Sequence, residues 1–551
     1  MNKLTKLMRA RLSRLSLVML LTGLLLLSNL GVVLAEEDRV TQQVRELIRS
    51  DYYLPVSEND LAGKSIDEML TFLADPHSQL FTYDEANHFI GQINNTYVGI
   101  GVSVNMMAQG LYLNTVFPDT PAEEAGLRAG DIILSADGLN LAGMSQEEAI
   151  SYIRGEPGTV VRLNILRGSE RWEVSVPRRE FTTPSIDAAL LNGHIGYVKL
   201  YTFAEDAAIQ FAQAVEELQT QQADSWIIDL CDNPGGYTDA ARDMAGYFIG
   251  KNPVAHEQYQ AYAVDLAKPT ASPWHFTQPV IVLVNQNSAS SSELLAAALY
   301  DYSKATLIGQ TTYGKGVGQT LYDLADGSVL KLTIFEYFSP AGRQIQGVGV
   351  TPDLEISPDD QYDELDIAIW LLEQDIEAQA SKEDTIHFMI GDHPFAIPAG
   401  ESFDAQDWQI WDQLLASVPV TALQRENKET QVWEGVDRFE LQKRWPLYFP
   451  GYQEIGSSAI PAQPGFIVRL GQDPVDWSTV NDEHIELINR ATGERNALRF
   501  QAVDDETVLI TTQTSLRLGN EYWLVIHPGI QETDGGDAGL QNALIRAVPT
   551  R

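Results

Sequence analysis

A serine cluster at a predicted strand-to-helix turn contains the residues best placed for covalent chemistry. The apolar strand 280–284 runs into a turn that holds Ser290, and an Ala- and Leu-rich helix, 294–301, follows. A helix N-terminus presents unpaired N–H groups and the positive end of its dipole, which would stabilise a developing oxyanion. The same segment fits a helix N-cap, with Glu293 completing a capping box. Taken alone, the segment favours a capping role for Ser290 over a nucleophilic one.

A lysine between two glycines changes that balance. Lys315 follows Ser290 by 25 positions (315 − 290) and is flanked by Gly314 and Gly316, without the GxxxxGK[ST] pattern of a phosphate-binding loop. A lysine is protonated at neutral pH, but burial in an apolar cleft lowers its pKa. Because flanking glycines let the backbone pack closely, we predict a Ser–Lys dyad in which a neutral amine takes the proton of the serine hydroxyl. The alternative is an ordinary surface lysine in a glycine loop.

Other catalytic and partner classes are not indicated. The nine histidines are scattered and form neither a Ser–His–Asp triad nor a HExxH metal site, and His77 is interpreted as structural. The single cysteine, Cys231, excludes an internal disulfide framework and a cysteine-based zinc site. The predicted Ser–Lys reaction implies no metal and no cofactor. The net charge of −39, from 37 basic and 76 acidic residues, argues against nucleic acid and against docking on anionic lipid through charge alone.

Hydrophobic periodicity divides the 551 residues into regions of different fold class. Residues 36–92 have the spacing of helices, and the period shortens to two residues from about 93. From 182 to 375, strand and helix patterns alternate, which indicates an α/β core. The elements predicted in that core are the strands 195–200, 226–230 and 280–284 and the helix 208–218.

Residues 93–181 resemble a PDZ domain. The matching segments are Tyr97-Val98-Gly99-Ile100-Gly101-Val102, Pro121-Ala122-Glu123-Glu124-Ala125-Gly126-Leu127 and Gly130-Asp131-Ile132-Ile133. A glycine-containing loop exposes backbone N–H groups that can hold a terminal carboxylate, and the adjoining strand edge can pair with an extended tail. The peptide-binding residues are therefore predicted to be Val98, Gly99, Ile100, Gly101 and Val102. The alternative is a β-rich spacer that binds nothing.

Residues from about 40 to 375 resemble the C-terminal processing peptidases, a family of Ser–Lys proteases with a built-in PDZ domain. The motifs occur in the family's order, and together they are far more specific than any one of them. They are Leu73-Ala74-Asp75-Pro76-His77-Ser78, the PDZ segments, Asp229-Leu230-Cys231-Asp232-Asn233-Pro234-Gly235-Gly236, Ser288-Ala289-Ser290-Ser291-Ser292-Glu293, Gly314-Lys315-Gly316-Val317-Gly318-Gln319, Phe338-Ser339-Pro340-Ala341-Gly342-Arg343-Gln344-Ile345 and Gly349-Val350-Thr351-Pro352-Asp353.

The resemblance implies a role for each residue of the site. Ser290 would be the nucleophile and Lys315 the general base, with Gln319 helping to hold the lysine amine. The oxyanion hole would consist of the backbone N–H of Ser290 and that of Gly236, in the Asn-Pro-Gly-Gly turn. Glycines after a buried strand let a backbone N–H approach a substrate closely, which agrees with this assignment.

Three positions depart from the family pattern without removing a catalytic group. Cys231 stands where the family usually has an arginine, which deletes a cation near the site, and we interpret it as a small buried residue. Gly318 stands in place of a valine, and Ser291 in place of an alanine.

Both ends of the chain extend beyond the resemblance. Residues 1–35 contain basic residues and then an apolar run, 15–35, before an acidic segment, which predicts either a cleaved export signal or a single membrane anchor. Residues 384–450 have a mixed pattern that gives no assignment. Residues 465–551 contain four predicted strands and resemble bacterial immunoglobulin-like modules, so a β-sandwich is expected.

The predicted fold class is multidomain α/β and β. The predicted regions, in order, are a signal or anchor (1–35), an N-terminal helical region (36–92), a PDZ domain (93–181), a Ser–Lys protease core (182–375), an unassigned region (384–450) and a β-sandwich (465–551).

The predicted function is that of an exported serine endopeptidase of the cell envelope. The PDZ domain would capture an apolar C-terminal tail of a protein substrate, and the dyad would cut the chain through an acyl-enzyme. The alternative is a catalytically inactive PDZ scaffold that binds C-terminal tails. No motif identifies an activator protein.

Overall fold

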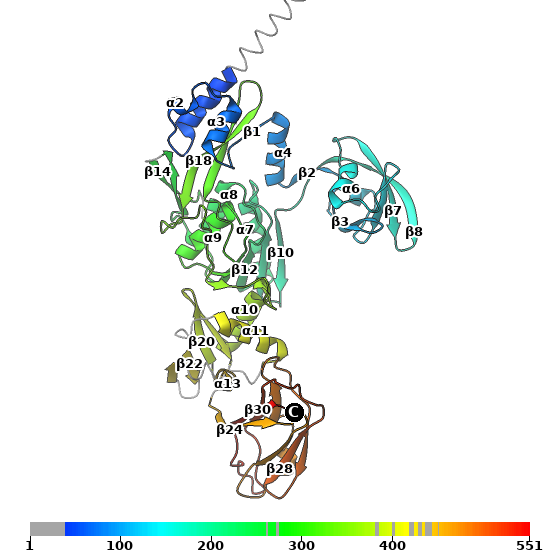
Figure 1. Ribbon diagram of the computed structural model, residues 1–551, viewed down its shortest axis with the longest axis vertical. Coiled ribbons are helices and arrows are strands. Elements are labelled where there is room, and N and C mark those ends of the chain that lie inside the picture. The colour runs from blue at the N-terminus through cyan, green and yellow to red at the C-terminus, as the bar shows by residue number, and fades with distance from the viewer. Residues whose placement is uncertain are drawn as a thin grey trace, which may run out of the picture. The chain divides into compact units, whose positions relative to one another are not determined.

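The computed structural model of the protein describes residues 39–260, 263–270, 275–380, 385–398, 403–417, 424–427, 432–435, 444–449 and 451–550 (Figure 1). They form two compact units. The first unit contains the residues up to 279 together with 284–304 and 311–351. The second contains 280–283, 305–310 and the residues from 352 onward. The predicted multidomain α/β and β fold class is confirmed.

Short helices open the described chain, as predicted. Residues 39–51 are helical, and α2 (Glu58–Leu61), α3 (Ile66–Leu73) and α4 (Tyr83–Ile93) follow. The helix α3 begins where Ser65 and Glu68 form a capping box. β1 (Gln79–Phe81) pairs antiparallel with β18 (Val329–Phe338), which brings the segment before β1 close to β18.

The region predicted to be a PDZ domain is built around one antiparallel sheet. Its strands lie in the order β3 (Val102–Met107), β4 (Gly110–Val116), β5 (Ile132–Ala136), β7 (Val160–Arg167) and β8 (Glu170–Pro177), with β6 (Leu139–Asn140) beside β5. The helices α5 (Pro121–Glu124) and α6 (Gln146–Ile153) contribute buried residues to its core. β2 (Thr96–Gly99) and β9 (Arg179–Thr182) pair with each other where the chain enters and leaves this domain.

Two sheets and three helices form the α/β core. The strand order of the six-stranded sheet is β10 (Ile186–Leu191), β11 (Ile195–Leu200), β12 (Ser225–Asp229), β15 (Val280–Val284), β16 (Thr306–Gly309) and β19 (Leu354–Glu355). Every residue of β12 and β15 is buried, as their apolar sequences predicted. The helices are α7 (Ala207–Thr220), α8 (Thr238–Ile249) and α9 (Ser291–Asp301). In the second sheet β18 lies between β1 and β13 (Ala255–Tyr259), β14 (Ala263–Ala267) follows β13, and β17 (Val317–Asp323) pairs with β18.

The region 384–450, which the sequence left unassigned, contains a small antiparallel sheet. Its strand order is β21 (His393–Pro398), β20 (Thr385–Ile390), β22 (Gln424–Asn427) and β23 (Val432–Gly435). The helices near it in sequence are α10 (Glu364–Ala380), α11 (Ala405–Ser417) and α13 (Trp445–Tyr448). Trp408 and Trp411 lie three positions apart on α11, on one face, and both are completely buried.

The C-terminal strands form two sheets that share one apolar core. One sheet has the order β24 (Gln453–Ile460), β30 (Ala543–Pro549), β29 (Tyr522–Ile526) and β26 (Ile485–Asn489). The other has the order β25 (Gly465–Arg469), β28 (Thr507–Thr512) and β27 (Leu498–Ala502). Buried side chains of both sheets belong to the same cluster, so the predicted β-sandwich is confirmed, while its immunoglobulin-like relationship stays a prediction.

The predicted signal or anchor, residues 1–35, lies outside the described residues. Within the described part of the chain, no helix has both the length and the apolar character needed to span a bilayer.

Candidate active site

Ser290 lies at a sharp turn between β15 and α9. Its backbone has φ 56° and ψ −114°, a conformation that non-glycine residues rarely adopt. Such strain persists only where the surrounding structure enforces it, and it is concentrated at functional sites. The side chain is 7% exposed.

The other serines of the cluster hold this turn in place. Ser288 Oγ donates to the carbonyl of Leu230 (2.8 Å), and Ser292 Oγ donates to the carbonyl of Asn233 (2.9 Å). The N–H of Ala289 also donates to Asn233 O (3.0 Å). The serine-rich sequence therefore ties the Ser290 turn to the turn that follows β12.

That second turn approaches Ser290 through glycine. Asn233 Nδ2 donates to Leu200 O (3.1 Å), and its Oδ1 accepts the N–H of Gly235 (2.9 Å), which fixes the turn. Gly235 has φ +102°, and a Cβ there would lie 2.7 Å from the Cβ of Ser290. Only glycine allows this approach. The predicted oxyanion residue Gly236 comes next in the same turn.

The predicted oxyanion donors differ in their availability. The N–H of Ser290 donates to Glu293 Oε2 (2.9 Å), so this N–H is not directed at a substrate in this structure. The physical reason is the capping box, in which the side chain of the third helical residue accepts the N–H of the N-cap residue. Over the described residues, the N–H groups of Gly236 and Ser291 have no hydrogen-bond acceptor. Ser291 is therefore a donor that the sequence interpretation missed.

Lys315 lies in the segment between β16 and β17 and is partly buried. Burial lowers the pKa of its amine, and the charge of Lys331 lowers this pKa further, while Glu293 and Asp75 act in the opposite direction. Lys331 itself lies over the rings of Phe81 and Phe89, at 5.2 and 4.7 Å from their centres. The net direction is the one that a lysine base requires.

Close backbone packing accounts for the burial of Lys315. A Cβ at Gly316 would lie 2.4 Å from the backbone nitrogen of Gln346. The N–H of Gly316 donates to Gln346 Oε1 (2.8 Å), and the N–H of Gly347 donates to Gly314 O (2.8 Å). The glycines on both sides of the lysine thus let its segment pack directly against the segment 345–349.

Gln319 lies on β17, next to an irregularity in its pairing with β18. Its Nε2 atom donates to Val317 O (3.2 Å) and Thr333 Oγ1 (3.4 Å). Both of these bonds use the amide nitrogen. The predicted contact with the amine of Lys315 would therefore be made by the amide oxygen of Gln319.

Each departure from the family pattern has a structural counterpart. Cys231 is buried, as predicted, and Lys199 Nζ donates to its carbonyl (2.7 Å) and to Asp229 Oδ1 (2.8 Å), so a cation does lie at this turn. Ser291 Oγ donates to Gly236 O (3.0 Å), a bond that an alanine could not make. At Gly318 a Cβ would lie 2.1 Å from the ring of Phe335, which leaves no room for valine.

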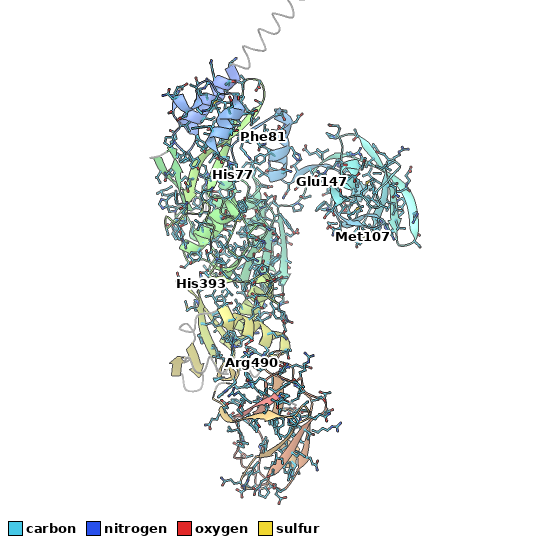
Figure 2. The ribbon with its side chains drawn as sticks, in the orientation of Figure 1. His77, Phe81, Met107, Glu147, His393 and Arg490 are labelled. Carbon is cyan, nitrogen blue, oxygen red and sulfur yellow. The ribbon has the colours of Figure 1, made fainter. Side chains whose placement is uncertain are left out.

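The segment before β1 lies within electrostatic range of the base. Asp75 accepts the backbone N–H of His77 (2.9 Å) and the hydroxyl of Ser78 (2.5 Å), and Ser78 Oγ accepts the N–H of Thr333 in β18 (3.0 Å). Burial lowers the pKa of the His77 ring, and the charge of Lys315 lowers it further. Figure 2 labels His77 together with Phe81 of β1. These bonds agree with the structural interpretation of His77.

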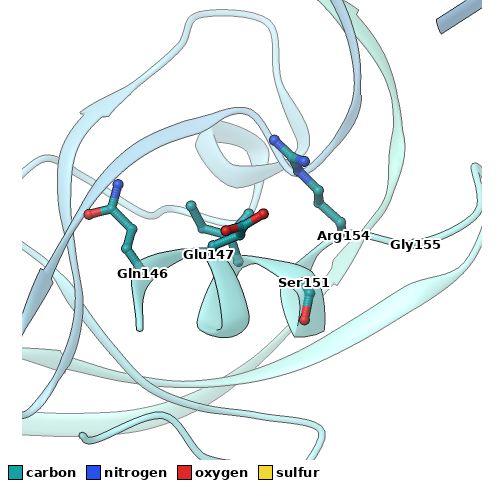
Figure 3. Close-up of a pocket in the computed structure, with 6 residues that line it drawn as sticks. Gln146, Glu147, Ser151, Arg154 and Gly155 are labelled. Atoms are coloured by element: carbon teal, nitrogen blue, oxygen red, sulfur yellow. The ribbon is translucent and has the colours of Figure 1, made fainter. Parts of the chain in front are cut away.

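All five predicted peptide-binding residues of the PDZ domain line one groove. The groove has a volume of about 920 Å³, and residues of α6, among them Ile150 and Ile153, line it as well. A second hollow, of about 700 Å³, follows the exposed side of α6, as Figure 3 shows with Gln146, Glu147, Ser151 and Arg154. Gln146 Oε1 accepts the N–H of Met106, at the far end of β3 (3.0 Å).

The described residues contain no group of three or more His, Cys, Asp or Glu side chains arranged to hold a metal ion.

Two family patterns match parts of this sequence. Peptidase family S41 matches residues 194–356, and the PDZ domain matches residues 113–167.

Known proteins extend the similarity. A probable CtpA-like serine protease of Staphylococcus haemolyticus (strain JCSC1435) is 31% identical over 324 residues, which cover 58% of this chain and 65% of that protein. The carboxy-terminal processing protease CtpA of Bacillus subtilis (strain 168) is 32% identical over 313 residues, which cover 56% of this chain and 67% of that protein. The chain thus spans about two thirds of the length of these relatives. Among solved structures, the photosystem II D1 C-terminal processing protease matches with a TM-score of 0.40 and 25% identity, over 60% of this chain and 95% of that one.

Proposed function

Because this chain belongs to peptidase family S41, we propose that it is a serine endopeptidase that cuts protein substrates with a Ser290–Lys315 dyad. The observation that carries the proposal is the shared carboxylate of Glu293, which accepts the N–H of Ser290 (2.9 Å) and the N–H of Lys315 (2.7 Å). One buried carboxylate thus joins the backbone of the strained serine to that of the partly buried lysine.

The chemistry follows from the states of these two groups. The neutral amine of Lys315 accepts the proton of the Ser290 hydroxyl while Oγ attacks the peptide carbonyl. The N–H groups of Gly236 and Ser291 stabilise the oxyanion of the tetrahedral intermediate. When the C–N bond breaks, the Lys315 ammonium returns the proton to the leaving amine. A water molecule, deprotonated by the same amine, then hydrolyses the acyl-enzyme. Gln319 would accept a hydrogen bond from the amine and orient it.

The PDZ groove would select the substrate. The strand edge of β3 would pair with an extended C-terminal tail, and the N–H groups around Gly99 and Gly101 would hold its carboxylate. Val98, Ile100 and Val102 make much of the groove wall apolar, which supports an apolar tail. We place the enzyme outside the cytoplasm on the predicted signal or anchor of residues 1–35.

Turnover of an unfolded protein that carries an apolar C-terminal tail tests the proposal. Wild-type protein is compared with Ser290→Ala, Lys315→Ala and the control Lys304→Ala, which changes an exposed lysine. Cleavage should be lost in both dyad variants and kept in the control. Undiminished cleavage in either dyad variant would remove the dyad, and tail binding without cleavage by wild type would establish the scaffold alternative.

A further inference from the structure

The two residues of the proposed dyad come from separate segments of the chain. Ser290 precedes α9, and Lys315 lies between β16 and β17. Proton transfer requires their side chains to meet within hydrogen-bond distance, so both backbones must be fixed relative to each other. The structure shows two groups that join them.

Glu293 holds the N–H side of both residues. Its carboxylate is completely buried, and Oε2 accepts the N–H of Ser290 and of Lys315. Oε1 accepts the N–H of Gly314 (2.7 Å) and the hydroxyl of Thr312 (2.6 Å). Four donors therefore satisfy this buried charge, which makes its position well defined.

Tyr337 holds the carbonyl side of the same two residues. Its hydroxyl lies 2.8 Å from Ser290 O and 2.7 Å from Lys315 O, so one phenolic hydrogen is shared between the two acceptors. The N–H of Tyr337 donates to Gly316 O (2.9 Å), which attaches the lysine segment to β18. The side chain is buried, and burial, reinforced by the charge of Glu293, raises the pKa of the phenol well above its ordinary value. The hydroxyl therefore remains a donor at every pH at which the enzyme is assayed.

We propose that Tyr337 is a positioning residue which, together with Glu293, fixes the backbones of Ser290 and Lys315 so that the amine and the hydroxyl stay aligned. This inference rests on the proposed dyad. The frame formed by Glu293 and Tyr337 holds each dyad residue at both its N–H and its C=O, and only the two side chains remain free to react. Loss of the phenolic hydroxyl removes the side-chain donor of both carbonyls. Ser290 O keeps the N–H of Leu294 as a donor (2.9 Å), so the Lys315 carbonyl is affected most, while Glu293 keeps the N–H groups in place.

The variant Tyr337→Phe removes only that hydroxyl, and Tyr322→Phe is its matched control. The Tyr322 hydroxyl, on β17 of the same sheet, donates to Asp51 Oδ2 (2.7 Å). We expect Tyr337→Phe to lower kcat by about 10- to 100-fold, since small misalignments at a reacting pair have effects of this size. KM should stay within about twofold, because substrate binding is unchanged. Tyr322→Phe should keep kcat within about twofold of the wild type, even if its melting temperature falls as much as that of Tyr337→Phe.

The outcomes separate this inference from the proposed function. If Ser290→Ala and Lys315→Ala abolish cleavage while folded Tyr337→Phe keeps the wild-type kcat, the positioning role is wrong and the dyad stands. An equal loss of kcat in both phenylalanine variants would also overturn it, because general loosening would then explain the effect. If Tyr337→Phe does not fold, Thr312→Val decides. It removes one donor from Glu293 and the acceptor of the Val350 N–H (2.7 Å). A reduced kcat in the folded variant supports the frame, and an unchanged kcat overturns it.

Discussion

Gly316→Ala tests the physical basis of the lysine base, which is backbone packing that limits the exposure of Lys315 to water. The added Cβ would lie 2.4 Å from the nitrogen of Gln346 and 3.0 Å from its Cα, whereas ordinary contact begins at 3.4 Å. The two segments must therefore separate by about 1 Å (3.4 − 2.4), because the obstacle is backbone and not a flexible side chain. Overpacking of this kind costs about 1–3 kcal/mol of folding free energy.

Two kinetic effects should accompany that separation. A displacement of about 1 Å at a reacting group lowers the rate by about 100-fold, and we expect this loss in kcat. Separation also admits water to Lys315 and removes part of the burial that lowers its pKa, so the pH midpoint of kcat should move upward, toward the ordinary lysine value of about 10.4.

The assay is kcat against pH with a tail-bearing unfolded substrate, with the melting temperature measured in parallel. Gly456→Ala is the control, because a Cβ there would meet only Ile545 Cγ2 at 3.8 Å, in the C-terminal sandwich. A Gly316→Ala protein with wild-type kcat and an unshifted pH midpoint would show that glycine packing does not set the protonation of Lys315.

Three further predictions follow from the same contacts. In the wild type, kcat should rise with pH as the neutral fraction of Lys315 grows, and the midpoint of this rise should lie below about pH 10.4. A flat profile of kcat from about pH 5 to 10, in an assay limited by the chemical step, would contradict the amine base. Lys199→Met removes the donor to Cys231 O in the turn after β12, which leads to Gly236, and should lower kcat by about tenfold with little change in KM. Unchanged kinetics would show that this turn keeps its conformation without the cation. Gln146→Ala frees the N–H of Met106 for pairing with a tail, so a long tail peptide should bind a few times more tightly in fluorescence anisotropy, and weaker binding would mean that Gln146 contacts the tail.

Much of the fold could be predicted from local pattern. The strands 226–230 and 280–284 correspond to β12 and β15, because a short, mainly apolar run suits a strand buried on both faces. Asp229 is the polar exception in the first run, and Lys199 pairs with it. Short apolar segments also located four C-terminal strands. Of these, β29 is buried throughout and β25 alternates between buried and exposed residues. The sheet within 384–450 was missed because its mixed pattern matches neither period.

The candidate site likewise has a part that the sequence predicted and a part that only the structure decided. Residue type and spacing were enough to propose a Ser–Lys dyad of Ser290 and Lys315, and the resemblance to the C-terminal processing peptidases supplied the roles of these residues and of Gly236. It also predicted two uses for one group, the N–H of Ser290, which could complete a capping box or stabilise an oxyanion. The structure assigns that N–H to Glu293, because the capping contact forms within four consecutive residues and requires no substrate.

Long-range contacts were decided by tertiary structure only. Tyr337 lies 47 positions from Ser290, and nothing in an alternating strand indicates which buried hydroxyl will meet two carbonyls of other segments. Lys199 likewise reaches the carbonyl of Cys231 across 32 positions, so a cation that the local motif lacks is supplied by a neighbouring strand. Local sequence thus specified which groups could react, and the packing of distant strands determined which donors and charges surround them, because hydrogen bonds and charge interactions depend on distance in space and not on distance along the chain.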